Sequence, residues 1–206
     1  MYERLGKRII DLLLGMILFI LLLPLFLVLM LGIKLDSSGP VFFRQKRVGK
    51  NKRYFNILKF RTMRTDAPKD MPTHMLQNPD AFITKTGRFL RKTSLDELPQ
   101  LINIIRGDMS FIGPRPALWN QYDLIEQRDR YDANTIRPGM SGLAQISGRD
   151  ELPIEVKAKL DGEYRKKMCF IFDVKCFLKT LLSVLRSDGV VEGGTGSIAE
   201  KKETKL

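Results

Sequence analysis

The sequence predicts an α/β protein, α+β-like and mostly helical, with an N-terminal membrane helix and further amphipathic helices that lie on the membrane surface. Three observations support this prediction. A long uncharged segment lies near the N-terminus, two short strand patterns follow it, and most of the remaining chain has helical patterns. With 206 residues, the chain is long enough for one domain and an anchor. We expect an anchor over 1–36, a domain at the membrane surface over 37–190 and a mobile tail over 191–206.

The anchor is predicted from the segment Leu12–Ile33, which holds no charged residue over 22 positions and could span a bilayer. A signal peptide would have a shorter apolar core and a small-residue cleavage site, so we expect the segment to be retained. Pro24 removes a helical hydrogen bond near the middle and favours a kink. Because both flanks are basic, a re-entrant hairpin bent at Pro24 would keep both on the cytoplasmic side. A kinked helix that crosses the bilayer once is equally compatible with these residues.

Charge is concentrated around this apolar segment. Residues 1–61 contain twelve Lys and Arg but three Asp and Glu, whereas the rest of the chain contains 23 and 20. Such a distribution suits the anionic surface of a phospholipid membrane. Nucleic acid would attract the same charge, but the usual nucleic-acid-binding motifs are missing, and we expect no nucleic acid partner. A single histidine, His74, disfavours a histidine-based triad and leaves acid–base or nucleophilic chemistry to carboxylates.

Strands are expected over 40–45 and 54–61, because both segments are rich in β-branched and aromatic residues, with a turn at 48–51. In a strand, Lys59 and Arg61 would share a face. Residues 64–80 contain three prolines among polar residues and are predicted to be a loop.

Helices are expected over 98–105, 119–132, 153–168 and 168–186. The last of these has one narrow polar stripe formed by Lys175, Lys179, Ser183 and Arg186. Its wide apolar face would either pack as core or lie in a membrane interface, and the sequence leaves both readings open.

The adjacent carboxylates Asp96 and Glu97 are the strongest candidates for chemistry. A purely structural interpretation is a capping box, in which Ser94 is the N-cap of a helix and the Glu97 side chain bonds the Ser94 backbone amide. Pro99 fits that reading imperfectly, so the helix would begin later or bend. In the functional reading, one carboxylate attacks a phosphorus atom and the other holds a magnesium ion that bridges phosphate oxygens.

Several cationic side chains could form an anion site with these carboxylates. Arginine recognises phosphate with its planar fork, and four arginines lie near rigid or Gly/Pro-rich segments. The candidate substrate- and phosphate-binding residues are Lys59, Arg61, Arg91, Arg115, Arg137 and Arg149.

Four motifs then identify a family resemblance. In chain order they are Lys59–Met63 (KFRTM), Ser94–Gln100 (SLDELPQ), Gly107–Pro116 (GDMSFIGPRP) and Arg137–Arg149 (RPGMSGLAQISGR). This series resembles the bacterial sugar transferases, specifically the monotopic phosphoglycosyl transferases that begin glycan assembly on polyprenyl phosphate. The resemblance covers residues 1 to about 190, and the short length is similar to the minimal members of the family.

The resemblance implies a magnesium-dependent reaction. A UDP-sugar would give its sugar phosphate to polyprenyl (undecaprenyl) phosphate, with release of UMP. By resemblance, Asp96 matches the nucleophile and Glu97 the magnesium ligand. Arg91 and Arg149 match phosphate-binding positions, and Lys59 matches a basic residue near the carboxylates.

The resemblance also favours the re-entrant hairpin, although Leu23 stands where the family has a serine before Pro24. It implies a bacterial inner-membrane protein whose active site faces the cytoplasm, and it allows a homo-oligomer. The sequence does not specify the sugar. Two other functions stay open at this point: a non-catalytic membrane-bound scaffold, which would release no UMP, and a membrane-tethered nucleic-acid binder, whose binding would be salt-sensitive.

Overall fold

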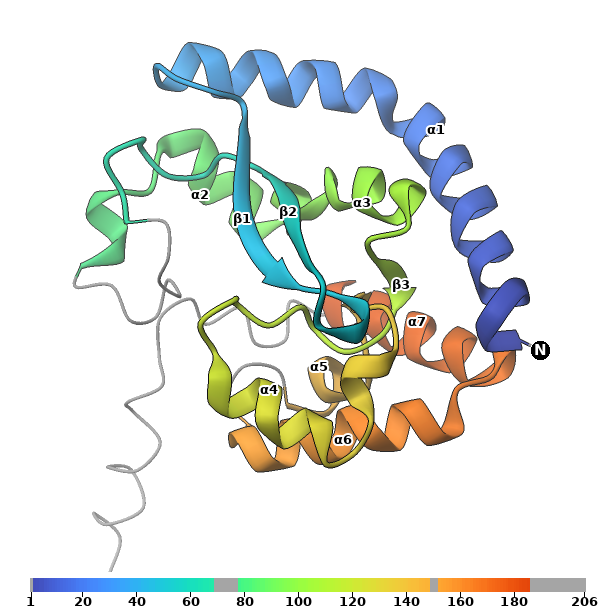
Figure 1. Cartoon of the computed structure of the whole chain (residues 1–206). Coiled ribbons are helices and arrows are strands. Elements are labelled where there is room, and N and C mark those ends of the chain that lie inside the picture. Colours follow the sequence, from blue (N-terminus) through green and yellow to red (C-terminus); the bar gives the residue numbers. More distant parts are fainter. Residues whose placement is uncertain (1, 69–77, 149–151, 186–206) are drawn as a thin grey trace, which may run out of the picture.

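The computed structural model describes residues 2–68, 78–148 and 152–185. A short π-helical turn over Tyr2–Gly6 leads into the long helix α1 (Lys7–Asp36). The strands β1 (Phe42–Val48) and β2 (Tyr54–Phe60) form an antiparallel hairpin in which Phe43 pairs with Lys59. In Figure 1, α1 arches over one side of the domain, and the hairpin crosses the front of it.

The remaining elements are mostly short helices. They are α2 (Lys85–Lys92), α3 (Gln100–Arg106), α4 (Tyr122–Asp129), α5 (Leu143–Gly148), α6 (Ile154–Lys167) and α7 (Phe170–Leu185). Two three-residue strands, β3 (Ser110–Ile112) and β4 (Gly139–Ser141), pair in parallel. The predicted mostly helical fold with a few strands is therefore confirmed, whereas α2, α5 and the β3–β4 pair were not anticipated.

Helix α1 is continuous through Pro24 and bends along its length (Figure 1). It is long and apolar enough to cross a membrane by length and composition. One face packs on the domain through Phe26, Leu29 and Ile33, which are at most 7% exposed. These side chains share a core cluster with Phe60 of β2. Large aliphatic side chains on the other faces of α1 are exposed along most of its length.

Both ends of α1 are attached to the same domain. At the N-terminal end, Arg8 donates hydrogen bonds to the carbonyl oxygens of Ile104 and Ile105, at 2.6 and 2.7 Å. At the C-terminal end, the Asp36 carboxylate accepts a 2.8 Å hydrogen bond from the Thr86 amide. The contacts therefore extend from one end of the helix to the other.

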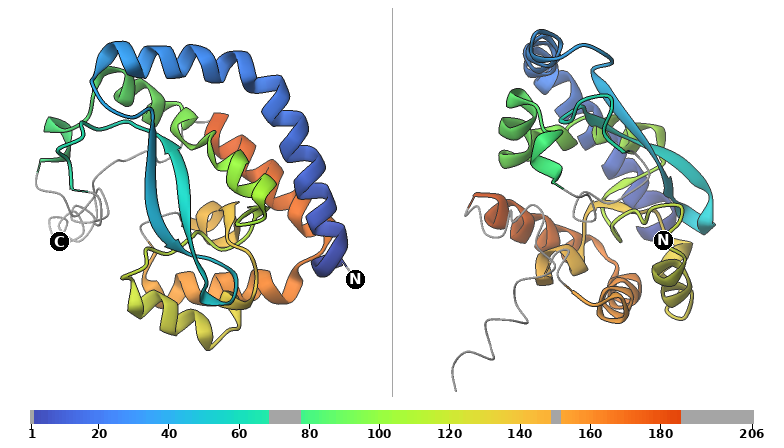
Figure 2. Two further views of the ribbon diagram at one scale, coloured as in Figure 1. Left: turned by 45° about the horizontal axis from the view of Figure 1, so that its top comes forward. Right: turned by 90° about the vertical axis from the view of Figure 1, so that its left-hand side faces the viewer.

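A buried polar cluster joins the start of α1 to α7. Figure 2 shows the start of α1 beside α7. The Lys7 ammonium is 2.5 Å from Asp173 Oδ2. The hydroxyl groups of Tyr2 and Tyr164 each donate a 2.6 Å hydrogen bond to the same carboxylate. Because a buried charge is costly without partners, these contacts fix the relative position of α1 and α7.

Helix α7 leaves its wide apolar face uncovered. Its large apolar side chains at positions 170, 171, 174, 177, 178, 181 and 182 are between 39% and 66% exposed. Asp173 and Cys176, on the opposite side, are buried against the domain. Within the described residues, this face does not pack as core.

Asn103 of α3 fixes the helix against the edge of β2. Its Oδ1 accepts a 2.9 Å hydrogen bond from the Leu58 amide, and its Nδ2 donates a 2.9 Å hydrogen bond to the Asn56 carbonyl oxygen. The side chain is completely buried. It therefore holds β2 at a defined position relative to the chain segment that precedes α3.

We predict that Asn103→Ala lowers the free energy of unfolding by about 2–4 kcal/mol, because it leaves the Leu58 amide and the Asn56 carbonyl without their buried partner. Chemical unfolding in detergent would measure the change. Glu126→Ala, at an exposed side chain of α4, is the control. A loss no larger than that of the control would contradict this role for Asn103.

Candidate active site

The two candidate carboxylates lie on a tight turn between α2 and α3. Ser94 adopts a left-handed conformation with φ of 57°, and a 3₁₀ turn follows over Leu95–Glu97. Helix α3 begins only at Gln100, after Pro99. The Ser94 side chain makes no capping hydrogen bond, so the capping-box prediction is wrong. The expected later start of the helix is confirmed. The Glu97 carboxylate is contacted by a side chain from another element and not by the start of the helix.

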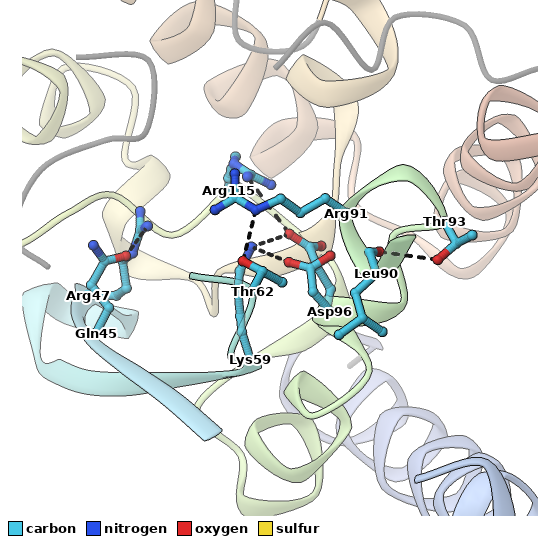
Figure 3. Close-up of polar contacts among 10 residues, drawn as sticks. Gln45, Arg47, Lys59, Thr62, Leu90, Arg91, Thr93, Asp96 and Arg115 are labelled. Atoms are coloured by element: carbon cyan, nitrogen blue, oxygen red, sulfur yellow. Dashed lines mark hydrogen bonds and ion pairs between the residues drawn. The ribbon is translucent and has the colours of Figure 1, made fainter. Parts of the chain in front are cut away.

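That element is β2, which contributes Lys59. The Lys59 Nζ lies 2.6 Å from Glu97 Oε1 and 3.6 Å from Asp96 Oδ2. Figure 3 shows the Lys59 side chain directed at Asp96. The side chains of Asp96 and Glu97 are 13% and 23% exposed, so both are largely sheltered while still accessible to a ligand.

Two arginines complete the positive side of the site. Arg115 Nη2 lies 3.9 Å from Glu97 Oε1. Arg47 of β1 donates 2.9 and 2.5 Å hydrogen bonds to the Pro116 carbonyl oxygen and to Gln45 Oε1, respectively. These contacts orient the Arg47 guanidinium, as Figure 3 shows beside Gln45. Both arginines line a small pocket. Its lining residues are Arg47, Ile57, Lys59, Glu97, Gln100, Arg115, Pro116, Gly139 and Met140.

The charges around Glu97 determine its ionisation. Burial alone would raise the pKa of this carboxyl. The charge and hydrogen bond of Lys59, with the charges of Arg115 and Arg47, outweigh burial and lower the pKa of Glu97 to about 2. Glu97 is therefore a carboxylate at neutral pH, and it can bind a cation without first losing a proton.

Arg91 approaches the site from the last turn of α2. Its Nε donates a 2.8 Å hydrogen bond to Thr62 Oγ1, and Figure 3 shows its side chain extending towards the region of Arg115. Helix α2 can lie this close because Gly87 has no side chain. A Cβ at Gly87 would lie 2.0 Å from the Thr62 carbonyl oxygen.

Two other predicted anion-binding residues, Arg61 and Arg137, do not line this pocket. Arg61 follows the end of β2 and is buried, with hydrogen bonds of 2.6 and 2.7 Å to the carbonyl oxygens of Ser38 and Ser37. It anchors the connection between α1 and β1. Arg137 donates to the Gly107 carbonyl oxygen and lines a separate pocket near Lys7. Arg149 lies outside the described residues.

The sequence reasoning overlooked two side chains that line the pocket, Arg47 and Gln100. Strand alternation could have found Arg47. The register pairs Gln45 with Ile57 and Arg47 with Phe55, which places Arg47 on the same face of the hairpin as Lys59. Gln100 had no comparable signal, because it was read only as a polar position in an apolar helix. It is 2% exposed in the structure.

The carboxylate pair could coordinate a magnesium ion that a substrate phosphate also coordinates. Within residues 2–68, 78–148 and 152–185, no three His, Cys, Asp or Glu side chains gather into a metal site. Two sheltered carboxylates are nevertheless a suitable donor set for Mg²⁺, which is commonly held by one or two carboxylates together with substrate phosphates. Asp96 and Glu97 could hold such an ion in the presence of a phosphate ligand.

Comparison with known proteins places this chain in a known family. The family model described as bacterial sugar transferase matches residues 2–187. The exopolysaccharide production protein ExoY of Sinorhizobium fredii is 35% identical over 198 residues, covering 89% of this chain and 87% of that protein. The UDP-glucose:undecaprenyl-phosphate glucose-1-phosphate transferase of Caulobacter vibrioides is 40% identical over 89% of this chain and 71% of its own length.

Some relatives are much longer. The undecaprenyl-phosphate glucose phosphotransferase of Komagataeibacter xylinus is 40% identical over 87% of this chain, but the match covers only 36% of that protein. The match in every case includes most of the present chain, and the family model spans its anchor, hairpin and carboxylate turn. The chain therefore belongs to the bacterial sugar transferase family.

Proposed function

We propose that this protein transfers a sugar 1-phosphate from a UDP-sugar to polyprenyl phosphate, with release of UMP, through a covalent intermediate on Asp96. The observation that carries the proposal is the sheltered Asp96–Glu97 pair in contact with Lys59 at a basic pocket. The names of the Caulobacter and Komagataeibacter relatives support undecaprenyl phosphate as the acceptor. Such a reaction would be the first membrane step in assembling a bacterial glycoconjugate.

The proposed reaction has two balanced steps. An Asp96 carboxylate oxygen attacks the phosphorus that carries the sugar, and the bond from that phosphorus to the bridging oxygen breaks, so that UMP leaves. A phosphate oxygen of polyprenyl phosphate then attacks the same phosphorus and releases the Asp96 carboxylate. One phosphoanhydride is broken and one is formed over the cycle, so no further energy source is needed.

The cationic residues have distinct parts in this proposal. Arg47 and Arg115 line the pocket beside the carboxylate turn and would bind phosphate oxygens with their planar guanidinium groups. Arg91 would add a third such group from α2. Glu97, with Asp96 beside it, would hold Mg²⁺, which supplies positive charge to the diphosphate when bound.

Covalent labelling tests the proposed nucleophile. Protein incubated with UDP-sugar labelled in the sugar, without acceptor, should retain label, whereas Asp96→Asn should retain none. We expect Asp96→Asn to lower UMP release with both substrates by roughly 10³-fold or more, because the attacking oxygen is lost. Asp123→Asn, on the exposed part of α4, is the control. Full turnover by Asp96→Asn would exclude the covalent mechanism, and a panel of UDP-sugars in the same assay would identify the donor.

The attachment of α1 supports a re-entrant arrangement. A straight helix of 30 residues would be about 45 Å long at 1.5 Å per residue. If it crossed the bilayer, one end would lie on the far surface, away from the domain. In the structure, Arg8 and Asp36 both contact the domain, one at each end. We therefore propose that α1 dips into the inner membrane and returns, with the active site on the cytoplasmic side.

Cysteine labelling tests this arrangement in a Cys169→Ser/Cys176→Ala background. Leu5→Cys and Ser38→Cys place thiols at exposed positions on either side of the apolar segment. In spheroplasts, neither thiol should react with a membrane-impermeant maleimide, and both should react once the membrane is permeabilised. Reaction of only one of them in intact spheroplasts would show that α1 crosses the bilayer.

The exposed face of α7 is proposed to lie in the membrane interface, beside the lipid acceptor. Leu178→Asp/Leu182→Asp should then slow transfer to acceptor embedded in vesicles, because a charged face disfavours insertion. Labelling of Asp96 by the water-soluble donor should stay unchanged. Tyr122→Asp, on the exposed side of α4, is the control. An equal loss in both half-reactions would indicate damage to the domain rather than to membrane contact.

A further inference from the structure

The position of Lys59 has a consequence for metal binding. A divalent cation shared by Asp96 and Glu97 would need to lie between their oxygens, and the Lys59 ammonium is the cation that contacts both carboxylates there, at 3.6 and 2.6 Å. We infer that Lys59 and a divalent cation compete for the same position between the two carboxylates, so that the metal displaces the Lys59 ammonium when it enters with a nucleoside diphosphate. This inference rests on the proposed function, since it concerns the same site.

The side chain of Lys59 can move without disturbing the fold. Its backbone is fixed, because β2 pairs with β1 along its length and the preceding Leu58 amide is bonded to Asn103. The ammonium, in contrast, is carried on a flexible four-carbon stem and is 21% exposed at the pocket. Displacement therefore requires rotation of one side chain rather than movement of the strand.

Charge balance makes the displacement necessary. Lys59 and Arg115 already lie within 4 Å of Glu97, and Arg47 lines the same pocket. A dication added beside an undisplaced Lys59 would meet strong repulsion at short range. Two carboxylates also provide too few ligands for tight binding of Mg²⁺ by protein alone. The metal should consequently bind weakly by itself and more tightly with a diphosphate, whose oxygens supply further ligands and accept the freed Lys59.

Metal binding by the purified, detergent-solubilised full chain tests this inference directly. The probe is Mn²⁺ alone, with free Mn²⁺ followed by electron paramagnetic resonance and with no nucleotide present. The informative variant is Lys59→Met, which removes the charge while keeping an unbranched side chain. Lys46→Met is the matched control, because Lys46 lies on the other face of the same hairpin, over the Tyr54 ring. Thermal unfolding would establish that each variant is folded.

We expect Lys59→Met to bind Mn²⁺ at least about ten-fold more tightly than the wild type, and Lys46→Met to match the wild type. Adding Glu97→Gln to Lys59→Met should abolish the gain. Lys59→Arg, which retains the charge, should bind as weakly as the wild type and provides a second test if Lys59→Met does not fold. Equal or weaker Mn²⁺ binding by Lys59→Met, or tighter binding by Lys59→Arg, would overturn the inference.

Failure of this inference and failure of the proposed function can be told apart. If wild-type protein is labelled on Asp96 by a UDP-sugar but Lys59→Met gains no affinity for Mn²⁺, the inference about Lys59 fails and the transferase function stands. If no label and no UMP are ever formed, yet Lys59→Met binds Mn²⁺ more tightly, the proposed function fails while the exchange of Lys59 for a cation holds.

Discussion

The contact of Lys59 with Asp96 and Glu97 is the interaction on which the site depends. Two neighbouring carboxylates with side chains less than a quarter exposed repel one another, and water cannot fully compensate for them. A cation from another element must therefore be held opposite the turn. Asn103 provides this alignment, because its side chain joins α3, which follows the carboxylate turn, to the backbone of β2 next to Lys59. The geometry of the site thus follows from packing between α3 and the hairpin.

The long apolar helix α1 is linked to the same strand. Phe60, the neighbour of Lys59, points to the opposite face of β2 and packs against Phe26 of α1, with ring centroids 5.3 Å apart. Consecutive residues of one strand therefore face α1 and the carboxylate pair. At the other end of α1, the Lys7–Asp173 contact fixes the helix to α7. Helix α1 is thus an integral part of the folded domain, and its position relative to the carboxylates is set by buried contacts rather than by a linker.

Local patterns in the sequence predicted the elements better than they predicted the site. The hairpin strands were predicted from their β-branched and aromatic residues, and the helices α3, α4 and α6 from their local composition. Helix α7 was predicted from its periodic polar stripe. The parallel pair β3–β4 was missed, since three-residue strands joined across a long stretch of chain leave no local signal. Arg61 was placed with Lys59, but the strand ends before it and its side chain turns to Ser37 and Ser38. Ser94 was read as a helix cap, although Pro99 delays the helix.

The proposed covalent intermediate suits the small basic pocket beside the carboxylate turn. A UDP-sugar is soluble, whereas polyprenyl phosphate is confined to the membrane, and direct transfer would require room for both phosphates around one reacting phosphorus. The described pocket is small and has one carboxylate turn. If Asp96 first retains the sugar phosphate, UMP can leave before the lipid phosphate enters, and the same arginines can bind each in turn. The exposed apolar surfaces of α1 and α7 would hold this pocket at the depth where the lipid phosphate lies. If the two substrates use the pocket one after the other, a small site can serve both the soluble UDP-sugar and the membrane-bound polyprenyl phosphate.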